Sequence, residues 1–167
     1  MLLIAGLIGT YWGHRDTSMA EVTEISGEEI KADVLAKLDQ YKDRSVLEQY
    51  AIFMGKAQIL EYGLKGLLAR NFNVPHEEME GWTLGKIKNE LKNKGLRPDF
   101  IVFLESVVDY RNKMAHEFLV NIGITRAIAN FSDRKLYGDL FRALYEIEQI
   151  TILHDWCEEN DAWLPCA

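Results

Sequence analysis

The feature of this sequence that most restricts its fold is a series of long segments in which apolar residues recur every three or four positions. Two of these segments begin with a capping box, Ser26-Gly27-Glu28-Glu29 and Ser45-Val46-Leu47-Glu48, in which a glutamate follows a serine three residues later. The two side chains of such a box satisfy free N–H groups at a helix N-terminus. Apolar spacing of this kind predicts amphipathic helices rather than strands.

The periodic segments predict four main helices and one short helix. The main helices are expected over residues 26–44, 45–71, 98–118 and 132–159, and the short helix over residues 83–95. Residues 121–131 fit either an extended piece or a turn. The sequence contains no pair of strand-like runs joined by hairpin turn residues. The expected fold class is therefore an all-α bundle.

A chain of 167 residues fits a single domain. We expect the helical domain over residues 26–160, an apolar arm over residues 1–25 and a tail over residues 161–167. Residues 2–13 are almost all apolar, but a membrane-spanning helix needs about 20 residues and a signal peptide needs a basic leader. We interpret the arm as a strand or helix that packs on the bundle or on a second copy. A weak anchor and an upstream extension are the alternatives, and stable membrane insertion is not expected.

Metal and cofactor chemistry find little support in the sequence. The two cysteines, Cys157 and Cys166, and the four histidines, at positions 14, 76, 116 and 154, lack the spacing of zinc sites. A chain of this length can bury a sufficient core without a structural metal or a disulfide. We expect neither a metal nor a cofactor, and we expect the reducing cytoplasm as the compartment.

The net charge of −7 argues against a broad electrostatic attraction to nucleic acid. A local basic surface is still compatible with that charge. One cluster of cations is interrupted by a single acidic residue, Glu90, and consists of Lys86, Lys88, Lys92, Lys94 and Arg97. This cluster is either a solvated helix face or a surface that follows the phosphates of an RNA strand.

Three polar residues, Arg111, Asn112 and His116, lie on the helix expected over residues 98–118. Arg111 falls on or beside the apolar stripe, where a charge is costly unless it is paired or lines a site. A guanidinium can bind a phosphate with two hydrogen bonds, a neutral imidazole can accept the proton of a ribose 2′-hydroxyl, and Asn112 could orient either partner. These residue types predict RNA cleavage without a metal ion. A capping cation or a surface salt bridge is the alternative interpretation.

Two carboxylates precede these residues on a similar helical face. Glu105 and Asp109 could orient Arg111 or His116 through a hydrogen bond, although Asp109 could equally form a plain ion pair with Lys113. Arg111 and His116 are five residues apart, which is about 140° of rotation on an α-helix. One such helix does not easily enclose a phosphate. A twofold axis beside it would bring two copies of each residue to one groove.

The segment Arg111-Asn112-Lys113-Met114-Ala115-His116, followed by a glutamate and an aromatic residue, resembles the HEPN superfamily, whose signature is an arginine, four to six residues and a histidine. Two other segments also resemble it, Gly55-Lys56-Ala57-Gln58-Ile59-Leu60-Glu61 and Thr83-Leu84-Gly85-Lys86-Ile87. The resemblance extends from about Ser45 to His154. It implies an up-and-down helical bundle, usually a homodimer, and often a metal-independent endoribonuclease of a toxin–antitoxin or other defence system.

By this resemblance, Arg111, Asn112 and His116 would be catalytic, and RNA and an antitoxin protein would be partners. Attack by the 2′-hydroxyl would leave a 2′,3′-cyclic phosphate. Some HEPN proteins have lost catalysis, so a non-catalytic module that binds a protein partner or a nucleotide is the alternative. The sequence departs from the family at Phe118. Some HEPN toxins carry at this position a tyrosine that a partner nucleotidyltransferase modifies, and phenylalanine offers no hydroxyl.

Overall fold

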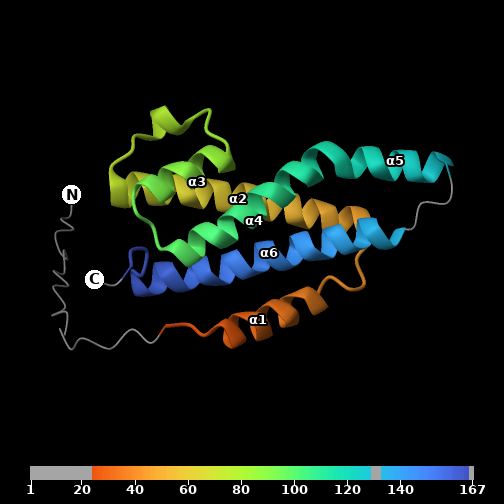
Figure 1. The fold of residues 1–167 in the computed structure, drawn as a ribbon, viewed down its shortest axis with the longest axis horizontal. Helices are drawn as coiled ribbons and strands as arrows, with labels where there is room; N and C mark the ends of the chain where they lie inside the picture. Colours follow the sequence, from red (N-terminus) through yellow and green to blue (C-terminus); the bar gives the residue numbers. More distant parts are fainter. Residues whose placement is uncertain (1–23, 129–132, 166–167) are drawn as a thin grey trace, which may run out of the picture.

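The computed structural model describes the backbone of residues 24–128 and 133–165, and the side chains of residues 24–123 and 137–165. Within these ranges the chain is helical and has no strand, which confirms the all-α bundle (Figure 1). In chain order the elements are α1 (Gly27–Asp39), α2 (Val46–Phe72), the 3-10 turn η1 (His76–Met79), α3 (Leu84–Asn93), α4 (Pro98–Lys113), the π-helical turn η2 (Met114–Phe118), α5 (Leu119–Ile128) and α6 (Asp133–Asn160).

Both predicted capping boxes form. At the start of α1, Ser26 Oγ accepts a hydrogen bond from the backbone N–H of Glu29 at 3.2 Å, and Glu29 Oε2 accepts one from the N–H of Ser26 at 2.9 Å. Ser45 and Glu48 repeat the arrangement at the start of α2, at 3.3 and 2.8 Å. The hydrogen bonds from each serine lower the pKa of the two glutamates. Four residues of local sequence thus decide where each of these helices begins.

The helix that contains Arg111 and His116 continues beyond its expected end. α4, η2 and α5 follow one another without a break, so residues 119–128 are helical and neither alternative for residues 121–128 is correct. The remaining residues of that interval, 129–131, lie outside the described part. A π-helical turn widens the helix without interrupting its chain of hydrogen bonds, and the helix can therefore pass through the Arg111–His116 region instead of ending beside it.

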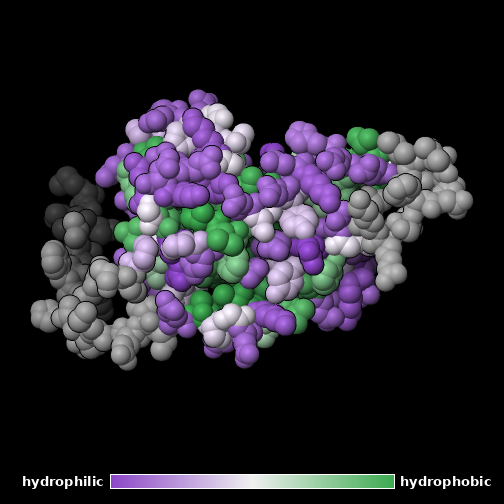
Figure 2. All heavy atoms as spheres, viewed as in Figure 1, coloured by the Kyte–Doolittle hydropathy of each residue, from purple (hydrophilic) through white to green (hydrophobic). Residues whose placement is uncertain are grey.

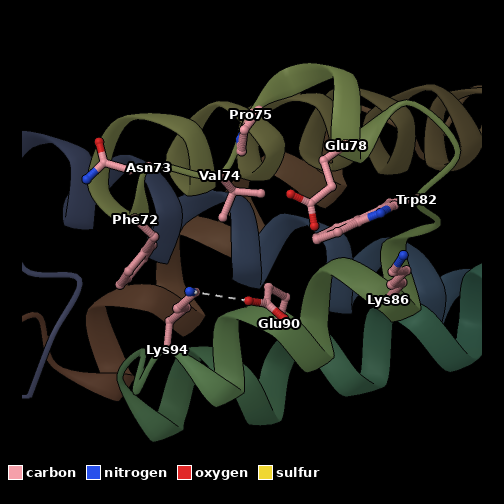
Figure 3. A pocket seen from close by; sticks show the side chains of 9 residues that line it. All are labelled: Phe72, Asn73, Val74, Pro75, Glu78, Trp82, Lys86, Glu90 and Lys94. Carbon is pink, nitrogen blue, oxygen red and sulfur yellow. Dashed lines mark ion pairs between the residues drawn. The ribbon is translucent and has the colours of Figure 1, made fainter.

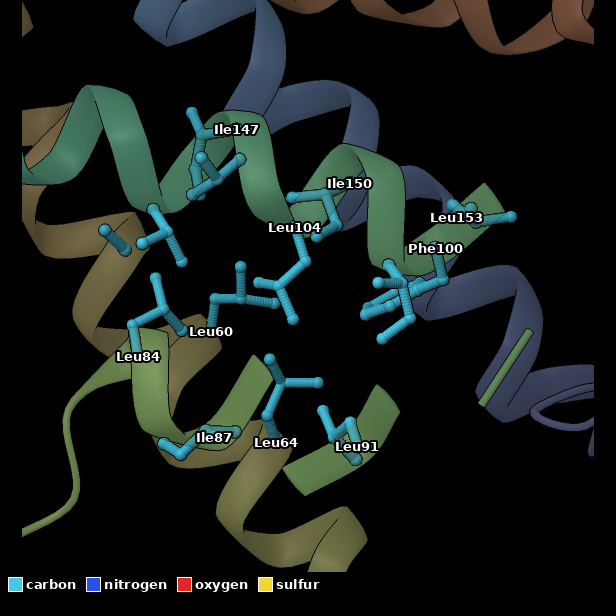
Figure 4. Close-up of a cluster of buried hydrophobic side chains, with 14 of the residues drawn as sticks. Leu60, Leu64, Leu84, Ile87, Leu91, Phe100, Leu104, Ile147, Ile150 and Leu153 are labelled. Atoms are coloured by element: carbon cyan, nitrogen blue, oxygen red, sulfur yellow. The ribbon is translucent and has the colours of Figure 1, made fainter. Parts of the chain in front are cut away.

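The core lies where α6 packs against α1, α2 and α4, while α3 covers α2 and α4. Figure 4 shows that α2, α3, α4 and α6 contribute side chains to one hydrophobic cluster. Its labelled members are Leu60, Leu64, Leu84, Ile87, Leu91, Phe100, Leu104, Ile147, Ile150 and Leu153. Hydrophilic side chains cover most of the face drawn in Figure 2, and hydrophobic ones come to the surface near its middle. The apolar stripes predicted from helical spacing therefore meet in one core.

One carboxylate is buried inside this bundle. Glu148 of α6 has no exposed surface. Its Oε1 accepts a hydrogen bond from Tyr41 Oη at 2.7 Å and pairs with Lys56 Nζ at 2.6 Å. Its Oε2 has no hydrogen-bond donor within the described residues, and Lys37 Nζ is 3.8 Å away. The cluster ties α1, α2 and α6 together through one negative charge, and no sequence motif indicated it.

The residues after α6 pack against the bundle. Trp163 is buried, and its ring makes edge contacts with Phe100 and His154 at centroid distances of 5.3 and 5.2 Å. The carbonyl of Trp163 accepts a hydrogen bond from the N–H of Arg97 at 3.0 Å. The apolar arm expected over residues 1–25 lies almost wholly outside the described residues. Within the described ranges, no helix is both long enough and apolar enough to span a membrane.

Candidate functional site around the π-helical turn

The turn η2 is held in place by two buried side chains. Met114 and Phe118 are almost fully buried, and the Phe118 ring stacks on Tyr50 of α2 at a centroid distance of 5.1 Å and an interplanar angle of 2°. The apolar spacing of residues 98–118 also predicts that Ala115 lies on the buried stripe, but Ala115 is exposed. Its position differs because winding in a π-helix is wider than the 3.6-residue repeat on which the expectation was based. Single π-helical turns inside α-helices frequently occur at functional sites.

The three motif residues lie on either side of the start of this turn. Arg111 is half-buried on the last turn of α4, Asn112 is exposed beside it, and His116 is exposed in the middle of η2. Arg111 Nη1 donates a long hydrogen bond, 3.5 Å, to Asn112 Oδ1. Neither Arg111 nor His116 forms an ion pair with any described side chain. Both side chains therefore retain hydrogen-bonding capacity for an anion.

The rotation between Arg111 and His116 differs from the value for a regular α-helix. The five-residue spacing gives about 140° only if the winding is α-helical throughout. The π-helical turn begins at Met114, between the two residues, and lowers the rotation per residue from that point. Arg111 and His116 consequently lie closer to one side of the helix than the spacing of a regular α-helix predicts.

Glu105 and Asp109 were expected to orient Arg111 or His116, but neither carboxylate pairs with either residue. Glu105 binds Lys88 of α3 at 2.8 Å, and this hydrogen bond lowers the pKa of Glu105. Asp109 is exposed, and it does not pair with Lys113, because Lys113 Nζ reaches Asp139 of α6 at 2.7 Å. At these two positions, Glu105 and Lys113 each pair with a residue on a neighbouring helix.

Two of the four lysines in the expected basic surface form ion pairs with glutamates. Lys88 pairs with Glu105, Lys94 pairs with Glu90 at 3.5 Å, and Lys86 lies over the Trp82 ring at 4.2 Å. Lys92 is exposed and has no ion-pair partner among the described side chains. The lysines of α3 thus form a mixed-charge surface, in keeping with the interpretation of this cluster as a solvated helix face.

Arg97 does not belong to that surface. Its guanidinium binds Asp99 through two hydrogen bonds of 2.7 Å, and these raise the pKa of Arg97. Nη1 also donates to the carbonyl of Ala162 at 3.3 Å, and the group lies over the Trp156 ring at 5.1 Å. Only 14% of its side chain is exposed. Arg97 therefore anchors the segment after α6 to the start of α4, a role that its position in the sequence did not indicate.

A groove of about 420 Å³ runs along α3 (Figure 3). Its lining residues come from the end of α2, the η1 segment and α3, and they are Phe72, Asn73, Val74, Pro75, Glu78, Trp82, Lys86, Glu90 and Lys94. Lys88 pairs with Glu105, and a Cβ at Gly85 would lie 3.6 Å from Val108 Cγ1. These two contacts show that α3 and α4 run antiparallel. The residues just before α3 therefore lie at the same height as Arg111 on α4. The lining of the groove nevertheless includes no residue of α4 or η2, and therefore none of the three motif residues.

The described residues contain no group of three histidine, cysteine or acidic side chains arranged to hold a metal ion. Cys157 is fully buried, and burial raises its pKa to about 11. A thiol with so high a pKa is a poor nucleophile at neutral pH. Among the described residues, the exposed imidazole of His116 and the guanidinium of Arg111 remain the candidates for chemistry.

Sequence reasoning missed two contacts that shape this region, the Tyr50–Phe118 stack and the Lys113–Asp139 ion pair. Both join residues far apart in the chain, so no local pattern could have indicated them. The comparisons with known proteins add no identification. No family model matches the chain, and no curated protein or solved structure matches it.

Proposed function

We propose that the chain is a metal-independent endoribonuclease of the HEPN type. The observation that carries this proposal is the placement of Arg111, Asn112 and His116 around a π-helical turn, with both ionisable groups unpaired among the described residues. An arginine and a histidine without ion-pair partners can bind a phosphate group and accept a proton from a ribose hydroxyl. The π-helical turn is itself kept in place by buried packing, which supports a role for its geometry.

The chemistry needs one base and one cation. The neutral His116 imidazole takes the proton of a ribose 2′-hydroxyl, and the 2′-oxygen forms a bond to the adjacent phosphorus. The bond from phosphorus to the 5′-oxygen breaks, and that oxygen takes the proton back from the imidazolium. Arg111 binds the non-bridging oxygens and stabilises the charge that develops on them. The products are a 2′,3′-cyclic phosphate and a 5′-hydroxyl, with Asn112 orienting the phosphate.

The biological setting belongs to the same proposal. We place the protein in the cytoplasm, as a homodimer that acts on RNA in a toxin–antitoxin or defence system, with an antitoxin protein as regulator. That regulator would not modify residue 118, because Phe118 has no hydroxyl and is 3% exposed under Tyr50. An antitoxin that binds over the exposed His116 is the form of inhibition that fits the site.

A non-catalytic module that binds a protein partner or a nucleotide is the second candidate. Two observations favour it, the net charge of −7 and the neutralisation of Lys88 and Lys94 by glutamates. Both reduce the electrostatic attraction of RNA. The groove along α3, with the indole of Trp82 in its wall, would be the place for such a ligand.

Incubation of the purified protein with a structured RNA in EDTA tests the proposal. We expect cleavage with 2′,3′-cyclic phosphate and 5′-hydroxyl ends, and a loss of at least about a hundredfold in His116→Ala, as is usual when a general base is removed. Arg111→Ala should also be impaired. His76→Ala, which removes an exposed histidine of η1, is the matched control and should cleave normally. Products with 5′-phosphate ends, or an unimpaired His116→Ala, would refute this mechanism.

A further inference from the structure

A second groove, of about 570 Å³, lies at the end of the bundle where α1 and α4 begin and α6 ends, and we call it the terminal groove. Figure 1 shows these three helix ends on the same side of the molecule. More of the wall is apolar than polar, and its apolar members are Pro98, Trp156, Ala162, Leu164 and Pro165. Leu164 is 56% exposed. The terminal groove therefore offers apolar surface that an occupant would remove from water.

Contacts within the bundle fix the wall of the terminal groove. Arg97 binds Asp99 through two hydrogen bonds of 2.7 Å, and its Nη1 donates to the carbonyl of Ala162 at 3.3 Å. The backbone N–H of Arg97 donates to the carbonyl of Trp163 at 3.0 Å, and the Trp163 side chain is buried. The segment after α6 is thus held in place without an occupant. A preformed groove loses little conformational entropy when it binds another segment.

The chain enters the described part of the structure at this groove. Glu24, the first described residue, lines it, and the neighbouring Ile25 packs against the core. Residues 14–23 connect this point to residues 2–13, which we call the apolar run. A connection of ten residues spans at most about 33–36 Å, and a segment tethered over so short a distance has an effective concentration on the order of millimolar. The covalent connection therefore favours the apolar run over a separate molecule as the occupant.

The composition of the apolar run fits the wall of the terminal groove. The run contains no charged side chain and is almost entirely apolar, so its exposure to water is costly. Apart from one internal ion pair, the charged residues of the groove are acidic, namely Glu24 and Asp161. These two carboxylates would repel an acidic occupant. The apolar run avoids this repulsion, and Arg15, the only lysine or arginine among residues 1–23, follows it closely.

We propose that the terminal groove binds the apolar run of the same chain. The bound run covers Trp156 and Leu164 and closes the end of the bundle where α1 and α4 begin. This surface is separate from the candidate functional site, because Arg111 lies about 20 Å along α4 from Pro98. The inference therefore does not rest on the proposed function. It gives the apolar arm a defined surface on its own bundle, in place of a second copy or a membrane.

Disulfide cross-linking in the full chain tests whether the apolar run reaches the terminal groove. Every variant carries Cys166→Ser and Leu164→Cys, and the remaining cysteine, Cys157, is fully buried. The third change is one cysteine within the run, in place of Ile4, Ile8 or Trp12. We expect at least one of these variants to form a disulfide within a single chain under mild oxidation. Mass spectrometry and non-reducing electrophoresis detect this bond and distinguish it from a bond between two chains.

The matched control carries Glu28→Cys in place of Leu164→Cys. Residue 28 is exposed and closer to the apolar run in the sequence, but it does not line the terminal groove. An undocked run would react with residue 28 at least as fast as with residue 164, so we expect the bond at residue 164 to form at least about tenfold faster. Equal rates would overturn the proposal. A bond that forms only between two chains would also overturn it, because the run would then occupy the groove of a second copy.

Hydrogen exchange of the full chain, followed by mass spectrometry, gives a second measurement that also needs no RNA. We expect the amides of the apolar run to exchange at least about tenfold more slowly than in an unfolded peptide, at a rate that does not change on dilution. Leu164→Arg should remove most of this protection, whereas Val102→Arg, at a 62% exposed residue of α4 outside the groove, should not. Protection that is absent, or that survives Leu164→Arg, contradicts the proposal. Protection that appears only with phosphatidylcholine vesicles also contradicts it, in favour of a membrane anchor.

Discussion

Replacement of Lys56 by methionine should destabilise the bundle far more than the loss of an ordinary ion pair. Lys56 Nζ lies 2.6 Å from Oε1 of Glu148, a residue with no exposed surface. After the substitution, the carboxylate keeps the hydrogen bond from Tyr41 at 2.7 Å and the distant ammonium of Lys37 at 3.8 Å. Removal of one partner of a buried pair costs about 3–5 kcal/mol, and we expect about 3 kcal/mol because these two groups remain.

The measurement is urea unfolding followed by circular dichroism, together with thermal unfolding. A loss of about 3 kcal/mol should lower the midpoint of thermal unfolding by about 6–12 °C in a chain of this size. The exposed pair of Lys42 and Asp39 is the control, and Lys42→Met should cost less than about 1 kcal/mol. Lys56→Met combined with Glu148→Met should recover most of the loss, since two apolar side chains leave no buried charge.

Additivity decides whether the reasoning is correct. If the double variant loses as much as the two single variants together, Lys56 and Glu148 do not interact energetically and the account of the cluster is wrong. The same conclusion follows if Lys56→Met costs no more than Lys42→Met. The buried geometry requires a strong energetic coupling between the two residues. The double variant should then be more stable than Lys56→Met alone.

The cluster also predicts a loss of stability at high pH. Burial, and then the hydrogen bond to Glu148, raise the pKa of Tyr41 above its usual value of 10.0. Burial alone would lower the pKa of Lys56, but the hydrogen bond and the attraction of Glu148 outweigh it and leave this pKa above 10.5. The folded chain thus holds both protons more tightly than the unfolded chain. Their contribution is complete below about pH 10 and is lost as the pH rises through the raised pKa values.

Three further predictions each follow from the surroundings of a single residue. Cys157 should react with iodoacetamide at least roughly a hundredfold more slowly in the folded chain than in urea, because it is buried and its pKa is raised from 9.0 to about 11; peptide mass spectrometry checks this. Tyr50→Phe should retain RNA cleavage and Tyr50→Ala should lower kcat about tenfold or more, because only the second loses the stack that places η2. Ser45→Ala should cost about 1 kcal/mol in urea unfolding through loss of the cap of α2.

Local sequence determined the helices and several of their boundaries. The boxes at Ser26 and Ser45 predicted two N-termini correctly because all their hydrogen bonds join residues three apart in the chain. The apolar stripes predicted an all-α bundle because the repeat of an α-helix depends only on its own backbone. The residues of the candidate site, Arg111, Asn112 and His116, could also be named from sequence, since the motif lies within six positions of one helix.

Tertiary structure decided the geometry and the partners. The π-helical turn that begins after Arg111 and contains His116 keeps Met114 and Phe118 buried, with Phe118 stacked on Tyr50 of another helix. The sequence of the turn itself carries no signal for this geometry. The ion-pair partner of Lys113 also depends on tertiary packing. Lys113 pairs with Asp139 and not with Asp109, which is four residues away. An ion pair within a helix contributes only a few tenths of a kcal/mol, so whichever carboxylate the packing of helices brings close determines the outcome.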